Sequence, residues 1–84
     1  MNKKEFINLI PSTIDHKSWG FSDLEIIYDT KDNKGACYRN NENLASYGSY
    51  GKSWEEVYLK MRKLLIDNGH VNGYFTQVDP LVSR

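Results

Sequence analysis

Apolar side chains recur at helical spacing in the first segment of the chain. Phe6, Leu9 and Ile10 stand at i, i+3 and i+4, which places them on one face of a helix. Pro11 then ends the pattern, because proline cannot continue a helix without losing a backbone hydrogen bond. The spacing predicts a short helix over about residues 2–10.

The next segment, residues 11–22, shows neither a helical nor a strand period. It is rich in Ser, Asp and Gly, a composition typical of loops. We therefore predict a loop here. Its Trp19 and Phe21 rings are expected to plug the edge of the core rather than to bind a ligand.

A strand-like alternation follows over residues 23–30. Leu24, Ile26 and Tyr28 fall on one face of this extended segment, and the residues between them fall on the other. The pattern predicts a strand in which these three side chains share one face.

Two turns rich in Asn, Asp and Gly divide the stretch that follows into further strands. Residues 31–35 end in a glycine that can take a positive φ, and they predict a hairpin that returns through residues 36–39. Residues 40–43 supply a second turn, and residues 44–50 form a third predicted strand.

The second helix has the clearest start signal in the sequence. Ser53 and Glu56 stand at the spacing of a capping box, in which each side chain accepts a hydrogen bond from a backbone N–H of the first turn. Asn68 and Gly69 supply the chemistry of a helix end. The apolar stripe between these signals comprises Trp54, Val57, Tyr58, Met61, Leu64 and Leu65.

Residues 71–78 mix β-branched and aromatic side chains and predict a fourth strand at a sheet edge. The expected order is therefore α-β-β-β-α-β. This is an α+β fold in which a small antiparallel sheet of three or four strands is covered by two helices. A chain of 84 residues is too short to divide into two cores, so residues 1–84 are expected to form one compact domain.

Composition narrows the classes of partner. The chain carries 11 basic and 11 acidic side chains, so no net charge draws it to nucleic acid or to an anionic membrane. No segment is apolar enough to span a bilayer and the start does not read as a signal peptide, so we expect no membrane partner and a cytoplasmic location. Cys37 is the single cysteine, which excludes an intramolecular disulfide.

No pattern in the sequence indicates an enzyme, a cofactor or a metal site. Residues 46–53 resemble a phosphate-binding loop, but a serine replaces its first glycine and the chain is too short for the parallel sheet of that fold. His16 and His70 lack further ligands at metal-binding spacing and are expected at the surface. A nucleophilic Cys37 would need a paired base that no motif supplies.

The segment that leads into the second helix has the composition of a recognition loop. Tyr, Ser and Gly alternate there, and tyrosine gives a large contact area at a low cost in conformational entropy. Tyr47 and Tyr50 are candidate contacts, with Arg39, Lys52 and Trp54 as candidate neighbours. The alternative is that one tyrosine points into the core and the other covers it.

From Leu24 to Leu65 the layout resembles the HicB antitoxin family. The shared features are a strand, a turn containing Asp and Gly, a second strand, and a helix that starts with Gly-Lys-Ser-x-Glu-Glu. The chain is also similar in class to the small inhibitors of phages and mobile elements, such as anti-CRISPR and toxin-immunity proteins. These resemblances imply a non-catalytic protein that binds and blocks a larger protein.

The order of elements also looks like the double-stranded-RNA-binding domain, which implies nucleic-acid binding as the alternative function. A local patch of lysines and Arg39 would contact phosphates, and Tyr47 or Tyr50 would stack on bases. Glu55 and Glu56 at the helix start would face those phosphates and disfavour the interaction. The basic side chains of this patch are Lys31, Lys34, Arg39 and Lys52.

Overall fold

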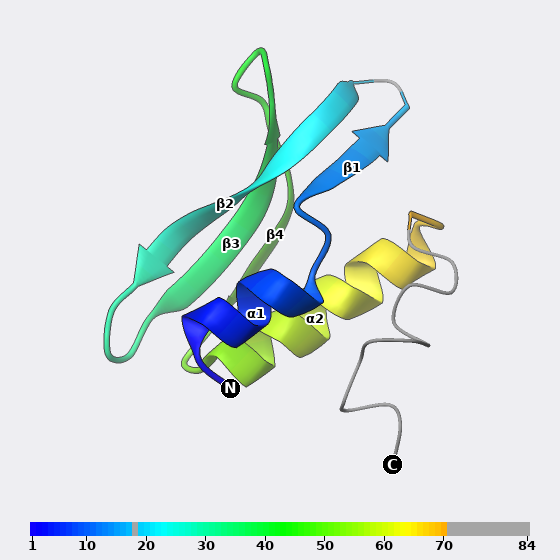
Figure 1. The fold of residues 1–84 in the computed structure, drawn as a ribbon. Coiled ribbons are helices and arrows are strands. Elements are labelled where there is room, and N and C mark those ends of the chain that lie inside the picture. The colour runs from blue at the N-terminus through cyan, green and yellow to red at the C-terminus, as the bar shows by residue number, and fades with distance from the viewer. Residues whose placement is uncertain (18, 71–84) are drawn as a thin grey trace.

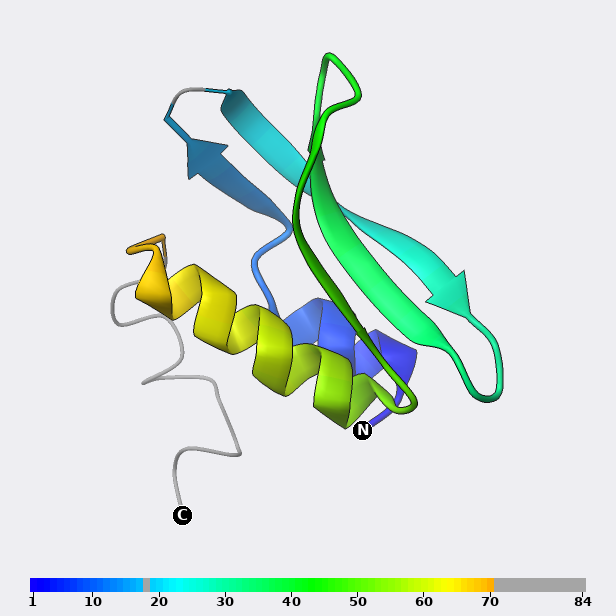
Figure 2. The same ribbon diagram turned by 180° about the vertical axis from the view of Figure 1, so that it is seen from behind.

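A computed structural model describes residues 1–17 and 19–70 of the chain. It shows a twisted, four-stranded antiparallel sheet and two helices, which confirms the predicted α+β class (Figures 1 and 2). The elements are α1 (Lys3–Leu9), β1 (Thr13–His16), β2 (Gly20–Asp29), β3 (Lys34–Asn40), β4 (Ala45–Gly51) and α2 (Trp54–Asp67).

The prediction of a loop over residues 11–22 is wrong, because this segment forms β1 and the start of β2. The two strands make an antiparallel hairpin in which Thr13 pairs with Asp23 and His16 pairs with Gly20. β1 is too short to show an alternating pattern. The predicted strand over residues 71–78 lies outside the described residues.

The strands lie in the order β1-β2-β3-β4, and both helices lie on the same side of the sheet (Figures 1 and 2). Register shows which side chains face the helices, since Leu24 pairs with Tyr38 and Ile26 pairs with Ala36. These side chains, together with Ile14 of β1, join the core cluster. We call this side of the sheet the inner face and the other side the open face.

The core fills the space between the inner face and the two helices. Phe6 of α1 stacks on Trp54 of α2 with ring centroids 5.1 Å apart, which joins the helices. The Tyr38 hydroxyl donates a hydrogen bond of 2.6 Å to the backbone oxygen of Pro11. The helical side chains that are buried are Phe6, Trp54, Val57, Tyr58, Met61 and Leu65.

The start of α2 confirms one half of the predicted capping box. Ser53 Oγ accepts the backbone N–H of Glu56 at 3.2 Å. The Glu56 carboxylate reaches back one residue further than predicted and accepts the backbone N–H of Lys52 at 2.7 Å. The full reciprocal box occurs instead at α1, between Asn2 and Glu5.

Two β-bulges flank the central strand β3 and decide which side chains reach the open face. In the first, the register slips between Ile26 and Tyr28 of β2, so that Tyr28 pairs with Gly35. A slip of one residue moves every later side chain to the opposite face. The prediction that Tyr28 shares a face with Leu24 and Ile26 is therefore wrong, and Tyr28 lies on the open face.

The second bulge lies in β4, where the pairing with β3 slips between Ser46 and Ser49. Tyr47 sits inside this bulge with a φ of 48°, a left-handed conformation that costs free energy for a residue with a side chain. Ser49 returns to the inner face, and its hydroxyl donates a hydrogen bond of 2.7 Å to the Val57 backbone oxygen. The bulge thus separates Tyr47 from Tyr50.

We expect Leu65→Ala to lower the free energy of unfolding by about 2–5 kcal/mol, because it leaves a cavity under the helix. Leu65 is fully buried, whereas Leu59 on the same helix is 50% exposed. Leu59→Ala is the matched control and should change stability by less than about 0.5 kcal/mol. Urea denaturation followed by circular dichroism measures both, and equal losses would contradict this account of the core.

Candidate functional site

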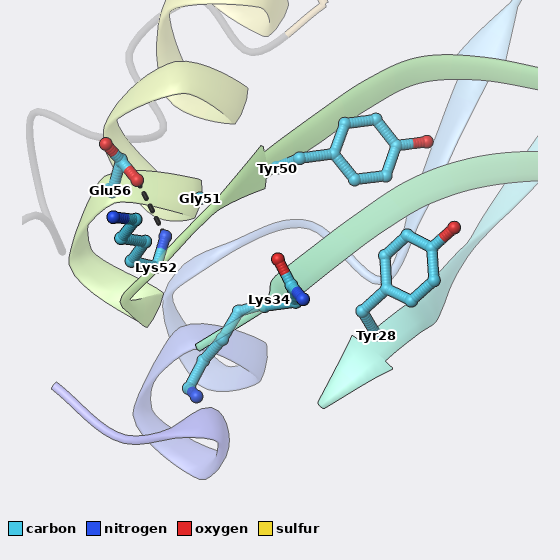
Figure 3. A pocket seen from close by; sticks show the side chains of 7 residues that line it. Tyr28, Lys34, Tyr50, Gly51, Lys52 and Glu56 are labelled. Carbon is cyan, nitrogen blue, oxygen red and sulfur yellow. Dashed lines mark hydrogen bonds between the residues drawn. The ribbon is translucent and has the colours of Figure 1, made fainter. Parts of the chain in front are cut away.

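A pair of tyrosines, Tyr28 of β2 and Tyr50 of β4, dominates one end of the open face. Their ring centroids lie 6.0 Å apart and the ring planes are tilted by 53°. Both are half exposed, Tyr28 at 52% and Tyr50 at 49%. They come together because each stands beside Gly35 of the strand between them. We call these two residues the tyrosine pair (Figure 3).

Two glycines form the surface on which the tyrosine pair rests. A Cβ atom on Gly35 would lie 2.5 Å from Tyr50 Cδ1 and 3.2 Å from Tyr28 Cδ2. A Cβ atom on Gly48 would lie 2.9 Å from the Tyr50 hydroxyl oxygen. The rings therefore lie against bare backbone, and any larger residue at Gly35 would displace them.

Lysines surround Tyr50 on both sides. One recess lies between the tyrosine pair and the start of α2, where Lys34 and Lys52 line it together with Glu56 (Figure 3). A second recess lies between β4 and α2, and its polar side chains are those of Ser49, Tyr50, Lys60, Lys63 and Asp67. Tyr50 lines both recesses, and two lysines and one acidic residue line each of them with it.

These lysines differ in how much of their charge is engaged within the chain. Lys34 Nζ donates to the backbone oxygens of Thr30 and Lys31. Lys60 Nζ donates to the Tyr50 backbone oxygen at 2.8 Å, and Lys63 pairs with Asp67 at 2.8 Å. The contacts of all three lysines are exposed, which leaves each ammonium accessible to water and to a partner.

Lys52 is the lysine that remains free, and it stands at the start of α2. Its ammonium forms no hydrogen bond or ion pair with the residues that the structure describes. At the helix start beside it, two backbone donors are already engaged, because Glu56 accepts the Lys52 N–H and Ser53 accepts the Glu56 N–H. The phosphate-loop resemblance of residues 46–53 gains no support from the fold, because the sheet that precedes the helix is antiparallel.

Tyr47 belongs to a different cluster on the other side of β4. Its hydroxyl lies 2.7 Å from His70 Nε2, and its ring stacks on His16 with centroids 5.1 Å apart. Trp19 stacks on the far side of His16, at 4.8 Å. We call these four residues the imidazole cluster. It joins the β1–β2 hairpin, the β4 bulge and the end of α2.

The imidazole cluster corrects two expectations from the sequence. His16 and His70 are not isolated surface histidines, since both are half-buried and their ring centroids lie 5.6 Å apart. Trp19 contacts His16 rather than the core, and Phe21 is 70% exposed on the open face. Spacing along the chain gave no sign of the cluster, because its members come from three separate elements.

The other predicted contact residues lie in different surroundings. Trp54 is 4% exposed and packs on Phe6, so it belongs to the core and is left out of the candidate site. Arg39 lies on the open face, where its guanidinium pairs with Glu25 and donates to the Asn43 backbone oxygen at 3.0 Å. Of the predicted residues, the structure brings Tyr50 and Lys52 together and adds Tyr28.

Sequence reasoning missed Tyr28 because simple alternation assigned it to the inner face. One signal was available: the adjacent pair Ile26 and Ile27 places two large apolar residues in succession within a strand, as happens where a bulge breaks the alternation. Gly35 directly opposite was a second sign of close approach by another side chain.

Cys37 faces the open side of the sheet but is buried under its neighbours. Burial raises the pKa of its thiol, and the nearby Arg39 guanidinium offsets this only in part. Since the thiolate is the reactive form, Cys37 is a poor nucleophile. Within residues 1–17 and 19–70, no group of three or more His, Cys, Asp or Glu side chains is arranged to hold a metal ion.

The chain was compared with protein-family profiles, curated proteins and solved structures. No protein-family profile, curated protein or solved structure matches it. In the part of the chain that the structure describes, no helix has the length and apolar character needed to cross a membrane.

We expect Tyr47→Phe to lower the free energy of unfolding by about 1 kcal/mol, because it removes the hydrogen bond to His70. Tyr50→Phe is the matched control: the Tyr50 hydroxyl has no partner among the described residues, so its removal should leave stability unchanged. Thermal melts of the two variants compare them directly. If Tyr47→Phe melts with the parent, the hydrogen bond between Tyr47 and His70 contributes nothing to stability.

Proposed function

We propose that this chain is a non-catalytic protein-binding domain that uses the tyrosine pair as its contact surface and acts as an inhibitor or neutraliser of a larger protein. The observation that carries the proposal is the exposed aromatic pair, Tyr28 and Tyr50, on a sheet face that neither α1 nor α2 covers. Tyrosine is among the residues that dominate binding free energy at protein interfaces.

The support beneath the tyrosine pair favours binding. Two rings in contact with backbone glycines lose little conformational freedom on binding, since Gly35 and Gly48 hold Tyr50 in place beforehand. The rings stand on strands rather than on a loop, and sites on regular elements keep their geometry more closely. The surface is thus preorganised for a partner.

The resemblance to HicB antitoxins and to small phage inhibitors suggests which partners to test first. These are toxins and the effector proteins of bacterial defence systems. A small domain can block such a protein by covering a functional surface, and this requires no chemistry of its own.

We expect Tyr50→Ala to weaken binding to the protein partner by about 2 kcal/mol or more while the melting temperature stays nearly unchanged. The partner is captured by affinity purification from host and phage-infected lysates and then titrated by calorimetry. Tyr47→Ala is the contrasting variant: it should melt early because Tyr47 holds the imidazole cluster. Full affinity in Tyr50→Ala would contradict the proposed surface.

Gly35→Ala provides a second variant that leaves both tyrosines in the chain. The added Cβ would lie 2.5 Å from Tyr50 Cδ1, so the exposed ring must move. Weaker binding in Gly35→Ala and in Tyr50→Ala would assign the effect to the arrangement of the rings.

Nucleic-acid binding is the second candidate, because Lys34 and Lys52 line the same recess as the tyrosine pair. Rings beside lysines can stack on bases while the ammonium groups contact phosphates. We expect weak binding or none, since the chain has no net charge and the open face also carries Asp23 and Glu25. Titration of labelled single- and double-stranded oligonucleotides at increasing salt tests this; tight binding that falls steeply with salt would favour nucleic acid.

A further inference from the structure

We infer that the tyrosine pair and the lysines around it bind an acidic segment of the partner protein, with a carboxylate at Lys52 and a neighbouring side chain of the segment on the rings. This inference rests on the proposed function and names the chemistry of the partner.

Charge around Tyr50 is unbalanced although the whole chain is neutral. The two recesses that share Tyr50 are lined by four lysines, Lys34, Lys52, Lys60 and Lys63. They contain two acids, Glu56 and Asp67, which leaves an excess of two positive charges. Because the chain as a whole has 11 basic and 11 acidic groups, this excess reflects a local segregation of charge.

Both acids in this region are already engaged. Glu56 accepts the backbone N–H of Lys52, and Asp67 pairs with Lys63. Neither carboxylate reaches the Lys52 ammonium. A carboxylate from outside the chain would therefore meet an unpaired cation at this position.

Hydrogen-bond donors at the surface point to the same chemistry. Neither the Tyr28 hydroxyl nor the Tyr50 hydroxyl has a partner among the described residues, and the Lys52 ammonium has none either. The two hydroxyls and the Lys52 ammonium lie at different ends of this surface, since both rings extend away from Lys52 (Figure 3) and the Tyr50 hydroxyl lies 2.9 Å from where a Cβ on Gly48 would stand. A carboxylate only accepts hydrogen bonds, so an acidic group at either end would meet a donor that no described residue engages. The exposed faces of the two rings would pack against an apolar or aromatic residue that stands next to the acidic residue in the partner segment.

The rest of the open face favours a protein segment over nucleic acid. Toward β1 and β2 the face carries Asp23 and Glu25, and Asp23 accepts a hydrogen bond from Thr13 at 2.8 Å. A nucleic-acid strand that continued across the sheet would bring phosphates against these carboxylates. A protein segment can place one or two acidic residues at the lysines and other side chains opposite Asp23 and Glu25.

The test is a selection of random peptides displayed on phage against the intact chain, followed by fluorescence titration of the selected peptides. We expect enrichment of Asp and Glu next to an aromatic or apolar residue. Lys52→Glu should weaken these peptides about tenfold, because it replaces attraction by repulsion at the proposed contact. It should not impair folding, since a helix start favours a negative side chain.

Lys17→Glu is the matched control, because Lys17 is an exposed lysine in the turn between β1 and β2, and lines neither recess beside Tyr50. It makes the same change in net charge and should leave peptide affinity unchanged. Equal losses in both variants would overturn the inference and assign the effect to net charge.

The remaining outcomes separate the inference from the proposed function. Selected peptides without acidic residues that still lose affinity in Tyr50→Ala would overturn the inference and leave the proposed function standing. If no selected peptide depends on Tyr50 and the chain binds oligonucleotides instead, both the inference and the proposed function are overturned. Sedimentation at increasing concentration tests for self-association. A dimer that is lost in Tyr50→Ala would overturn the acidic segment as the partner and identify a second copy of the chain in its place.

Discussion

The β-bulges on either side of β3 are the constraint on which the rest of this structure depends. Side chains of a strand alternate between faces, so one extra residue reverses every position after it. The slip after Ile26 turns Tyr28 outward, and the slip around Tyr47 lets Ser49 face α2 while Tyr50 faces out. Without them, the two tyrosines would not meet above Gly35.

The bulges also keep the residues that stabilise the fold apart from the residues that we propose bind a partner. The core between the inner face and the helices holds aromatic residues such as Tyr38 of β3 and Trp54 of α2, and substitutions there remove buried contacts. The imidazole cluster joins elements at one end through Tyr47. The tyrosine pair contributes to neither set, so its exposed area is not required by the core, which is why we assign it to binding.

Local signals predicted the helices and β3 and β4, because capping residues, turn residues and helical spacing act within a few residues of the chain. β1 was not predicted because four residues show too little alternation to distinguish a strand from a loop. The outward position of Tyr28 was not predicted because a bulge depends on how two strands pair. Trp54 was misjudged because closeness in sequence to Tyr50 says nothing about the face that it occupies. His16 and His70 meet only through tertiary structure.

A chain with no net charge can still have a surface region with an excess of positive charge, as the region around Tyr50 shows. Asp23 and Glu25 lie on strand β2, while the lysines beside Tyr50 come from β3, α2 and the turn before α2. Asp23 and Glu25 line neither recess beside Tyr50, and Glu25 pairs with Arg39 instead. Salt screens charges that lie more than a Debye length apart, so a partner experiences the charge near its contact rather than the sum over the chain. The absence of net charge therefore removes a long-range attraction to nucleic acid, while the local arrangement of charge around Tyr50 bears on which partner a contact there would favour.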